Sequence, residues 1–148
     1  MRRAGVTLGF VLALLGAAAA RAEAPALAGV WTATNAGGTV FRGAWTAEVA
    51  AGTPDVALGT WTLVDDRGAV RMGGTWSARH TPHGWRGAWS ARVAVGNQVL
   101  SGTWEADDRT LKGARTFRDL LMRSAETPIA GVWHMGRAHG NWWLGTRR

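Results

Sequence analysis

One three-residue pattern, Gly-x-Trp, recurs along the chain and constrains its fold more than any other feature. Seven copies begin at Gly29, Gly43, Gly59, Gly74, Gly87, Gly102 and Gly131. Their tryptophans are 13 to 16 residues apart, except for a last gap of 29 that Leu111 to Phe117 fills as a degenerate copy. A fixed period indicates one repeated structural unit, so we expect eight units from Gly29 to about Ala138.

The period leaves room for one strand of about 10 residues and a tight turn, which is the rhythm of an antiparallel meander. Residues that favour turns stand between the copies, at 35–38, 51–55, 65–68, 81–83, 96–97 and 107–109. Asp119 to Thr127 departs from this rhythm, because Asp119 can cap a short helical turn that Pro128 ends. The sequence therefore predicts an all-β meander with one short helical turn near 119–127.

Successive strand residues face opposite sides, and the two sides differ in composition. In the second unit, Phe41 and Trp45 share one face, whereas Arg42, Thr46 and Glu48 share the other. An apolar face opposite a polar face is typical of a soluble antiparallel sheet and not of a membrane barrel. Gly and Trp lie on the same inward face, so an indole can cover the bare backbone of a neighbouring strand's glycine. Closure of about eight such strands into a barrel removes exposed edges; an open sheet or a β-solenoid is the competing architecture.

The first 22 residues have the pattern of a secretory signal peptide. Arg2 and Arg3 precede an uncharged, mainly apolar run from Gly5 to Ala20, which is followed by small-x-small sites that end at Ala22 and Ala24. The run is shorter than the roughly 20 residues of a membrane-spanning helix. We therefore expect cleavage after Ala22 or Ala24, export to the periplasm or the medium, no membrane span in the mature chain, and one domain over 23–148.

Charge and cysteine content exclude several classes. The chain has a formal net charge of +7 and no cysteine, so no disulfide can stabilise it. Signal cleavage would remove Arg2, Arg3 and Arg21, and the remaining arginines are scattered rather than clustered. This pattern does not favour nucleic-acid binding.

The residues that could carry chemistry occur in patterns that have simpler explanations. His80, His83, His134 and His139 match no strong metal-binding spacing. The pairs Asp65-Asp66 and Asp107-Asp108 fall in turns, where aspartate side chains bind the backbone. No serine lies in a Gly-x-Ser-x-Gly elbow. We therefore expect no catalytic residue, no metal, no cofactor and no enzyme activity.

The repeat resembles the avidin and streptavidin family and, more widely, the eight-stranded calycin barrels. The resemblance rests on Gly29-Val30-Trp31, on the Gly-Thr-Trp segments at 59–61, 74–76 and 102–104, and on Leu111 to Phe117. It implies a closed barrel with a ligand site inside. The residues that hold biotin in that family are missing, since Ala33 replaces its asparagine, Arg115 replaces its acid, and the chain contains no tyrosine.

A ligand, if present, would lie inside the barrel. The predicted ligand-binding residues are Trp31, Trp45, Trp61, Trp76, Trp89, Trp104, Arg115 and Trp133. Aromatic walls favour a small apolar or aromatic molecule, and Arg115 would also accommodate an anion. The indoles could instead fill the interior, leaving a structural or protein-interaction module such as an envelope-associated subunit or a secreted inhibitor. Adjacent Trp142 and Trp143 must face opposite sides, so one of them lies outside the core. The oligomeric state, including a homo-oligomer, stays open.

Overall fold

A computed structural model describes residues 27–107, 111 and 113–144 of the chain. The predicted signal peptide and both of its cleavage sites lie outside the described residues. Within the described part of the chain, no helix is both long and apolar enough to cross a membrane.

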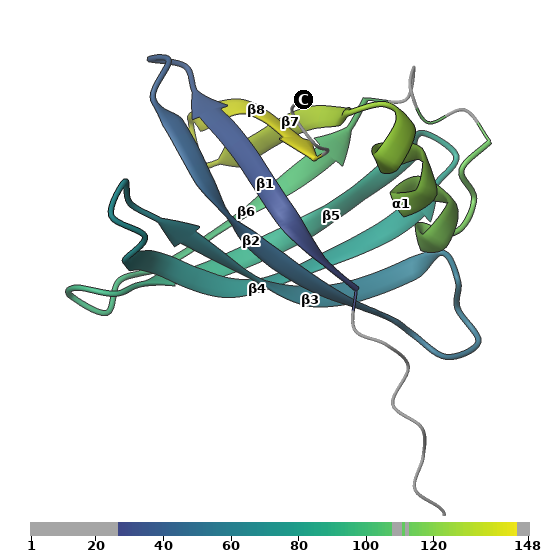
Figure 1. Cartoon of the computed structure of the whole chain (residues 1–148), viewed down its shortest axis with the longest axis horizontal. Coiled ribbons are helices and arrows are strands. Elements are labelled where there is room, and N and C mark those ends of the chain that lie inside the picture. Colours follow the sequence, from purple (N-terminus) through teal and green to yellow (C-terminus); the bar gives the residue numbers. More distant parts are fainter. Residues whose placement is uncertain (1–26, 108–110, 112, 145–148) are drawn as a thin grey trace, which may run out of the picture.

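The described residues form eight antiparallel strands and one helix, α1 (Figure 1). In the chain, α1 follows the sixth strand and precedes the seventh. The strands are β1 (Leu27–Asn35), β2 (Val40–Val49), β3 (Val56–Val64), β4 (Val70–Thr81), β5 (Gly84–Val93), β6 (Val99–Ala106), β7 (Ile129–Met135) and β8 (Ala138–Leu144), and the helix is α1 (Phe117–Glu126). Each strand pairs with the next along the chain, so the topology is the predicted meander.

The sheet closes into a barrel because β8 also pairs with β1. The closing register places Ala33 opposite Trp142 and Thr32 opposite Trp143. The all-β class, the antiparallel meander and the closed eight-stranded barrel are thus confirmed. The open sheet and the β-solenoid are excluded.

One predicted strand is wrong, because Leu111 to Phe117 is not a copy of the repeat. Phe117 begins α1, with Thr116 as its N-cap, and Leu111 and Ala114 are buried in the connection before the helix. The eighth strand instead contains Gly140-Asn141-Trp142, a true copy that follows Trp133 after a short hairpin. The helical segment itself, predicted at 119–127, is confirmed as Phe117–Glu126, which begins two residues earlier and ends one residue earlier. The predicted cap is wrong, because the N-cap is Thr116 and Asp119 lies in the first turn.

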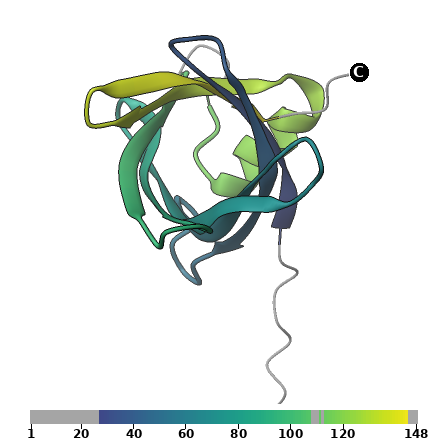
Figure 2. The ribbon, with the colours of Figure 1, turned by 90° about the vertical axis from the view of Figure 1, so that its left-hand side faces the viewer.

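The two ends of the barrel differ. Turns 36–39, 65–69, 94–98 and 136–137 form one end, which we call the mouth. Turns 50–55 and 82–83 and helix α1 lie at the opposite end, which we call the α1 end. Figure 2 looks along the barrel from the mouth, with α1 behind the ring of strands. In the turn 94–98, Gly96 and Asn97 both have positive φ angles, of 88° and 55°, as a tight hairpin requires.

The outer surface carries the polar residues that the alternation predicted. Hydroxyl pairs join neighbouring strands there, with 2.7 Å between the Oγ1 atoms of Thr46 and Thr60 and 3.0 Å between the side-chain oxygens of Thr75 and Ser90. Trp143 pairs in register with Thr32 and Ala130, next to the inward-facing Trp142. The expected split of Trp142 and Trp143 between the two faces is therefore confirmed.

Candidate functional site

Eight indoles line the interior of the barrel, one from each strand. The odd-numbered strands contribute Trp31, Trp61, Trp89 and Trp133, and the even-numbered strands contribute Trp45, Trp76, Trp104 and Trp142. Four pairs of neighbours within these sets meet edge to face; the ring centroids of Trp31 and Trp61 are 5.6 Å apart, for example, and those of Trp104 and Trp142 are 5.4 Å apart. This is the geometry that aromatic pairs prefer.

Most of these indoles are fixed to the wall by their N–H groups. Trp31 Nε1 donates to the carbonyl oxygen of Thr62, two strands away, at 3.0 Å. The same link across an intervening strand joins Trp61 to Ser90, Trp76 to Thr46, Trp104 to Ser77 and Trp133 to Thr34, at 2.9–3.2 Å. Each of these tryptophans therefore ties three strands together and uses its one polar atom in doing so.

The glycine of the repeat leaves the space through which each indole passes. A Cβ atom at Gly43 would overlap the Thr62 carbonyl oxygen and lie 2.7 Å from Trp31 Nε1. The same conflict arises at Gly59 with Trp76 and at Gly87 with Trp104. The predicted packing of indoles over bare glycine backbone is thus confirmed, and its cause is the hydrogen bond that the indole makes beyond the glycine.

The indoles do not fill the barrel, and a cavity of about 300 Å³ remains between them. Besides the eight indoles it is lined by Ala33, Phe41, Leu63, Met72, Leu100, Phe117, Leu120, Met135 and Leu144. No charged side chain is among these described lining residues. A volume of about 300 Å³ is at the lower end of the range for ligand sites, and eight-stranded barrels are wide enough to hold one small molecule.

Helix α1 closes one end of this cavity. Phe117 and Leu120, each 3% exposed, point from α1 into the barrel. The ring centroids of Phe117 and Trp76 are 5.6 Å apart. Trp85, only 1% exposed, donates from Nε1 to the Ala114 carbonyl oxygen at 2.8 Å. Phe117, Leu120 and Trp85 belong to one buried cluster. The indoles from the even-numbered strands pack against this cluster, and those from the odd-numbered strands do not.

A capping box holds the first turn of α1. The backbone N–H of Asp119 donates to Thr116 Oγ1, and the Asp119 carboxylate accepts from the Thr116 backbone N–H. The hydrogen bonds from the side chain and the backbone of Thr116 lower the pKa of Asp119 below its ordinary value of 3.8. The cap thus directs Phe117 and Leu120 into the barrel.

The tryptophans of the predicted site come together, whereas Arg115 does not join them. All seven predicted tryptophans line the cavity. Arg115 is exposed just before the N-cap of α1 and is not among the described residues that line it. Sequence reasoning missed Trp142, although Gly140-Asn141-Trp142 matches the repeat. It also missed Met72, which alternation places on the same face as Trp76, and Phe117, for which only the fold provides a signal.

The histidines and aspartates lie apart from the cavity. His80 packs on Trp85 with 5.4 Å between the ring centroids, and His134 lies opposite His139 on the outer face of the β7–β8 hairpin, with 6.4 Å between their ring centroids. Across the described ranges, no three histidine, aspartate or glutamate side chains are close enough to hold a metal ion.

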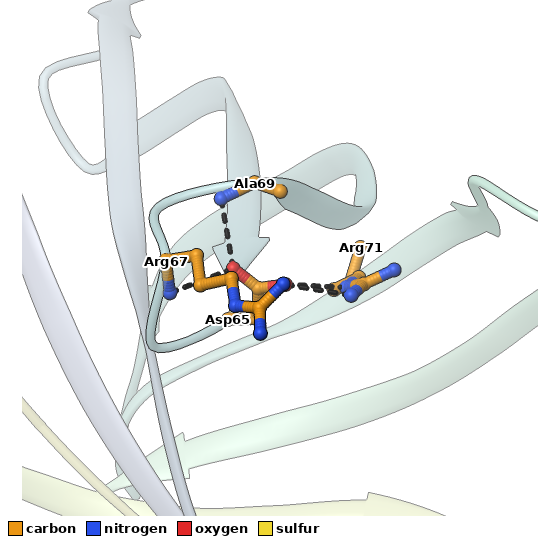
Figure 3. A network of polar contacts seen from close by, with 4 residues as sticks. All are labelled: Asp65, Arg67, Ala69 and Arg71. Carbon is orange, nitrogen blue, oxygen red and sulfur yellow. Dashed lines mark hydrogen bonds and ion pairs between the residues drawn. The ribbon is translucent and has the colours of Figure 1, made fainter.

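Asp65 serves the turn at the mouth, as its position predicted (Figure 3). Its carboxylate accepts from the backbone N–H groups of Arg67 and Ala69 at 3.0 and 2.9 Å and forms an ion pair with Arg71 at 2.7 Å. The hydrogen bond from Ala69 is the main cause that lowers the pKa of Asp65 below 3.8. This carboxylate is therefore a structural acceptor.

Comparison with known proteins does not assign this chain to a family. No family model matches the chain. Neither a curated protein nor a solved structure is significantly similar to it. The function must therefore be argued from the cavity.

Proposed function

We propose that this protein is a non-enzymatic barrel that binds one small, uncharged apolar or aromatic molecule in its central cavity. The observation that carries the proposal is the cavity of about 300 Å³, whose described walls consist of indoles, phenyl rings and aliphatic side chains. A well-formed apolar pocket in a small domain is the usual form of a ligand site.

The walls select against polar and charged molecules. Five lining indoles already donate their N–H groups to backbone carbonyl oxygens two strands away, so those donors are not free for a ligand. A buried polar group without a partner costs about 1–3 kcal/mol. A carboxylate would lose more, since Arg115 lies outside the cavity. The uncharged ligand is therefore favoured over the anionic one, and biotin is disfavoured because Trp45 is the one described lining indole whose buried N–H lacks a partner, which leaves most of the polar groups of the urea unpaired.

The proposal is tested with N-phenyl-1-naphthylamine, an uncharged probe whose emission rises in apolar sites. We expect saturable binding of one probe per chain. Naphthalene should displace it, and 2-naphthoate, which adds only a carboxylate, should be weaker by about tenfold or more, since a loss of 1.4 kcal/mol corresponds to tenfold in affinity. Stronger displacement by 2-naphthoate would contradict the uncharged ligand.

Two neighbouring positions on β6 give a matched control. Leu100 lines the cavity, whereas Val99 faces outward and is 61% exposed. Leu100→Trp should fill part of the cavity and weaken probe binding, and Val99→Trp should leave it unchanged. If the probe does not bind, or binds equally to both variants, the cavity is not a ligand site, and the structural or protein-interaction module becomes the better explanation.

A further inference from the structure

We propose that the cavity is entered only through the mouth, and that the apolar side chains there determine which molecules pass, while α1 is a fixed plug. The proposal extends the proposed function, because it assigns the entrance of the same site. It follows from the unequal burial of the two ends of the barrel and from the contacts that fix α1.

The α1 end is closed by close packing. The buried core cluster is composed of Ala47, Ala57, Ala78, Trp85, Ala106, Leu111, Ala114, Phe117, Leu120 and Ile129. Every strand residue in this cluster lies at the α1 end of its strand. Four small alanines on the wall leave room for the side chains of α1 and of the segment before it. None of these residues is more than 9% exposed, so no path to the cavity runs between them.

Hydrogen bonds also fix the plug on both sides. The backbone N–H of Phe117 donates to the Pro54 carbonyl oxygen in the β2–β3 turn at 2.8 Å. On the β5 side, buried Trp85 Nε1 donates to the Ala114 carbonyl oxygen at 2.8 Å. Lifting α1 would break both bonds and expose Phe117 and Leu120, so opening this end costs burial and hydrogen bonding together.

Among the described residues, the mouth has neither a buried core cluster nor a plug that hydrogen bonds hold in place. Only the four short turns surround it, and no described helix lies across it (Figure 2). The cavity residues nearest to it are Phe41, Leu63, Met72, Leu100 and Met135, all of them partly exposed. Buried Ala33 also faces the cavity near this end, but it is not part of the core cluster. Unbranched methionine side chains are adaptable, so Met72 and Met135 can move aside as a ligand passes.

Thiol labelling tests the entrance without any ligand, because the chain has no native cysteine. Ala33 and Ala47 form a matched pair: both face inward and are 5% and 1% exposed, but Ala33 lies towards the mouth and Ala47 at the α1 end. Single variants Ala33→Cys and Ala47→Cys are reacted with N-ethylmaleimide under native conditions. Each rate is divided by the rate in urea. If Ala47→Cys does not fold, Ala78→Cys replaces it at the same end.

We expect Ala33→Cys to react about tenfold faster or more, since a buried site without a channel reacts only when the structure opens locally. Equal rates, or faster reaction at the α1 end, would overturn the mouth as the sole entrance. In the Ala33→Cys background, Met135→Trp should slow labelling, and Met122→Trp, at a 68% exposed position on α1, should not. An unchanged rate with Met135→Trp would overturn the selecting role of the mouth side chains.

The two proposals fail differently. Rapid labelling at Ala33→Cys without binding of N-phenyl-1-naphthylamine would leave the entrance in place and contradict the ligand. Binding of the probe with equal labelling of Ala33→Cys and Ala47→Cys would support the ligand site and contradict the mouth as the sole entrance.

Discussion

The indole of Trp31 passes over Gly43, its direct partner on the neighbouring strand, so closely that a Cβ atom at Gly43 would lie 2.7 Å from Nε1. The contact is required because Trp31 must reach the carbonyl oxygen of Thr62 on the strand beyond. The Gly-x-Trp rule therefore involves three strands. One strand supplies the indole N–H donor, the next supplies the glycine that leaves space for the indole, and the third supplies the carbonyl acceptor.

Two adjacent glycines on β4 test this rule. A Cβ atom at Gly74 would overlap the Ser90 carbonyl oxygen and lie 2.7 Å from Ala91 Cα, whereas the nearest atom to a Cβ at Gly73 is 3.5 Å away. Gly74→Ala should lower the free energy of unfolding by about 1–3 kcal/mol or more, because backbone must move. Gly73→Ala should be neutral or stabilising by about 0.4–1 kcal/mol. Urea denaturation measures both, and equal effects would contradict the rule.

The hydrogen bonds of the indoles can be separated from their packing by comparing Trp31 with Trp45. Trp31 Nε1 has a carbonyl partner, whereas Trp45 Nε1 is buried without a partner. Replacement by phenylalanine removes similar volume at both positions. Trp31→Phe should therefore cost about 0.5–1.5 kcal/mol more than Trp45→Phe, the usual contribution of one hydrogen bond. The difference is read from chemical denaturation, and a larger loss with Trp45→Phe would show that packing dominates.

The stability of the mouth turn should depend on pH through Asp65. Its pKa is lowered in the folded protein, chiefly by the hydrogen bond from Ala69, so the folded state binds this proton less readily than the unfolded chain does. The carboxylate therefore stabilises the fold above the unfolded pKa, near 3.8, and this contribution is lost as the pH falls through the lower folded value. Asp65→Asn should reduce the melting temperature at pH 7, and the difference from the wild type should shrink below pH 4. Asp66→Asn, in the same turn, is the control. A difference that does not change with pH would contradict this role.

The cap of α1 can be weakened without touching the cavity. Thr116→Ala removes the side-chain acceptor for the Asp119 N–H and should cost about 1 kcal/mol. Thr127→Ala, at the other end of the helix, keeps the backbone N–H that donates to the Arg123 carbonyl oxygen and should cost less. Thermal unfolding monitored by circular dichroism compares the two. Equal losses would show that the capping box does not hold the plug.

Local sequence determined the strand period, the turns and the side on which each residue lies. Alternation at Phe41, Trp45 and Arg42 requires only that a strand is extended, so the inward and outward faces could be predicted before any strand was paired. The Gly-x-Trp interlock was also predictable, because both of its residues lie on one face.

Tertiary structure alone decided between a closed and an open sheet, where the short helix packs, and whether the indoles fill the interior. The pairing of β8 with β1 joins residues about a hundred positions apart, as the bond from Trp133 to Thr34 does, and no local pattern specifies such a contact. The segment Leu111 to Phe117 looked like a strand, but Thr116 and Asp119 cap a helix whose Phe117 is buried at the α1 end. Whether eight indoles fill a barrel depends on where each N–H finds its carbonyl. For five of the indoles the acceptor lies two strands away and holds the ring against the wall, so the cavity is a property of the closed barrel and not of any single repeat.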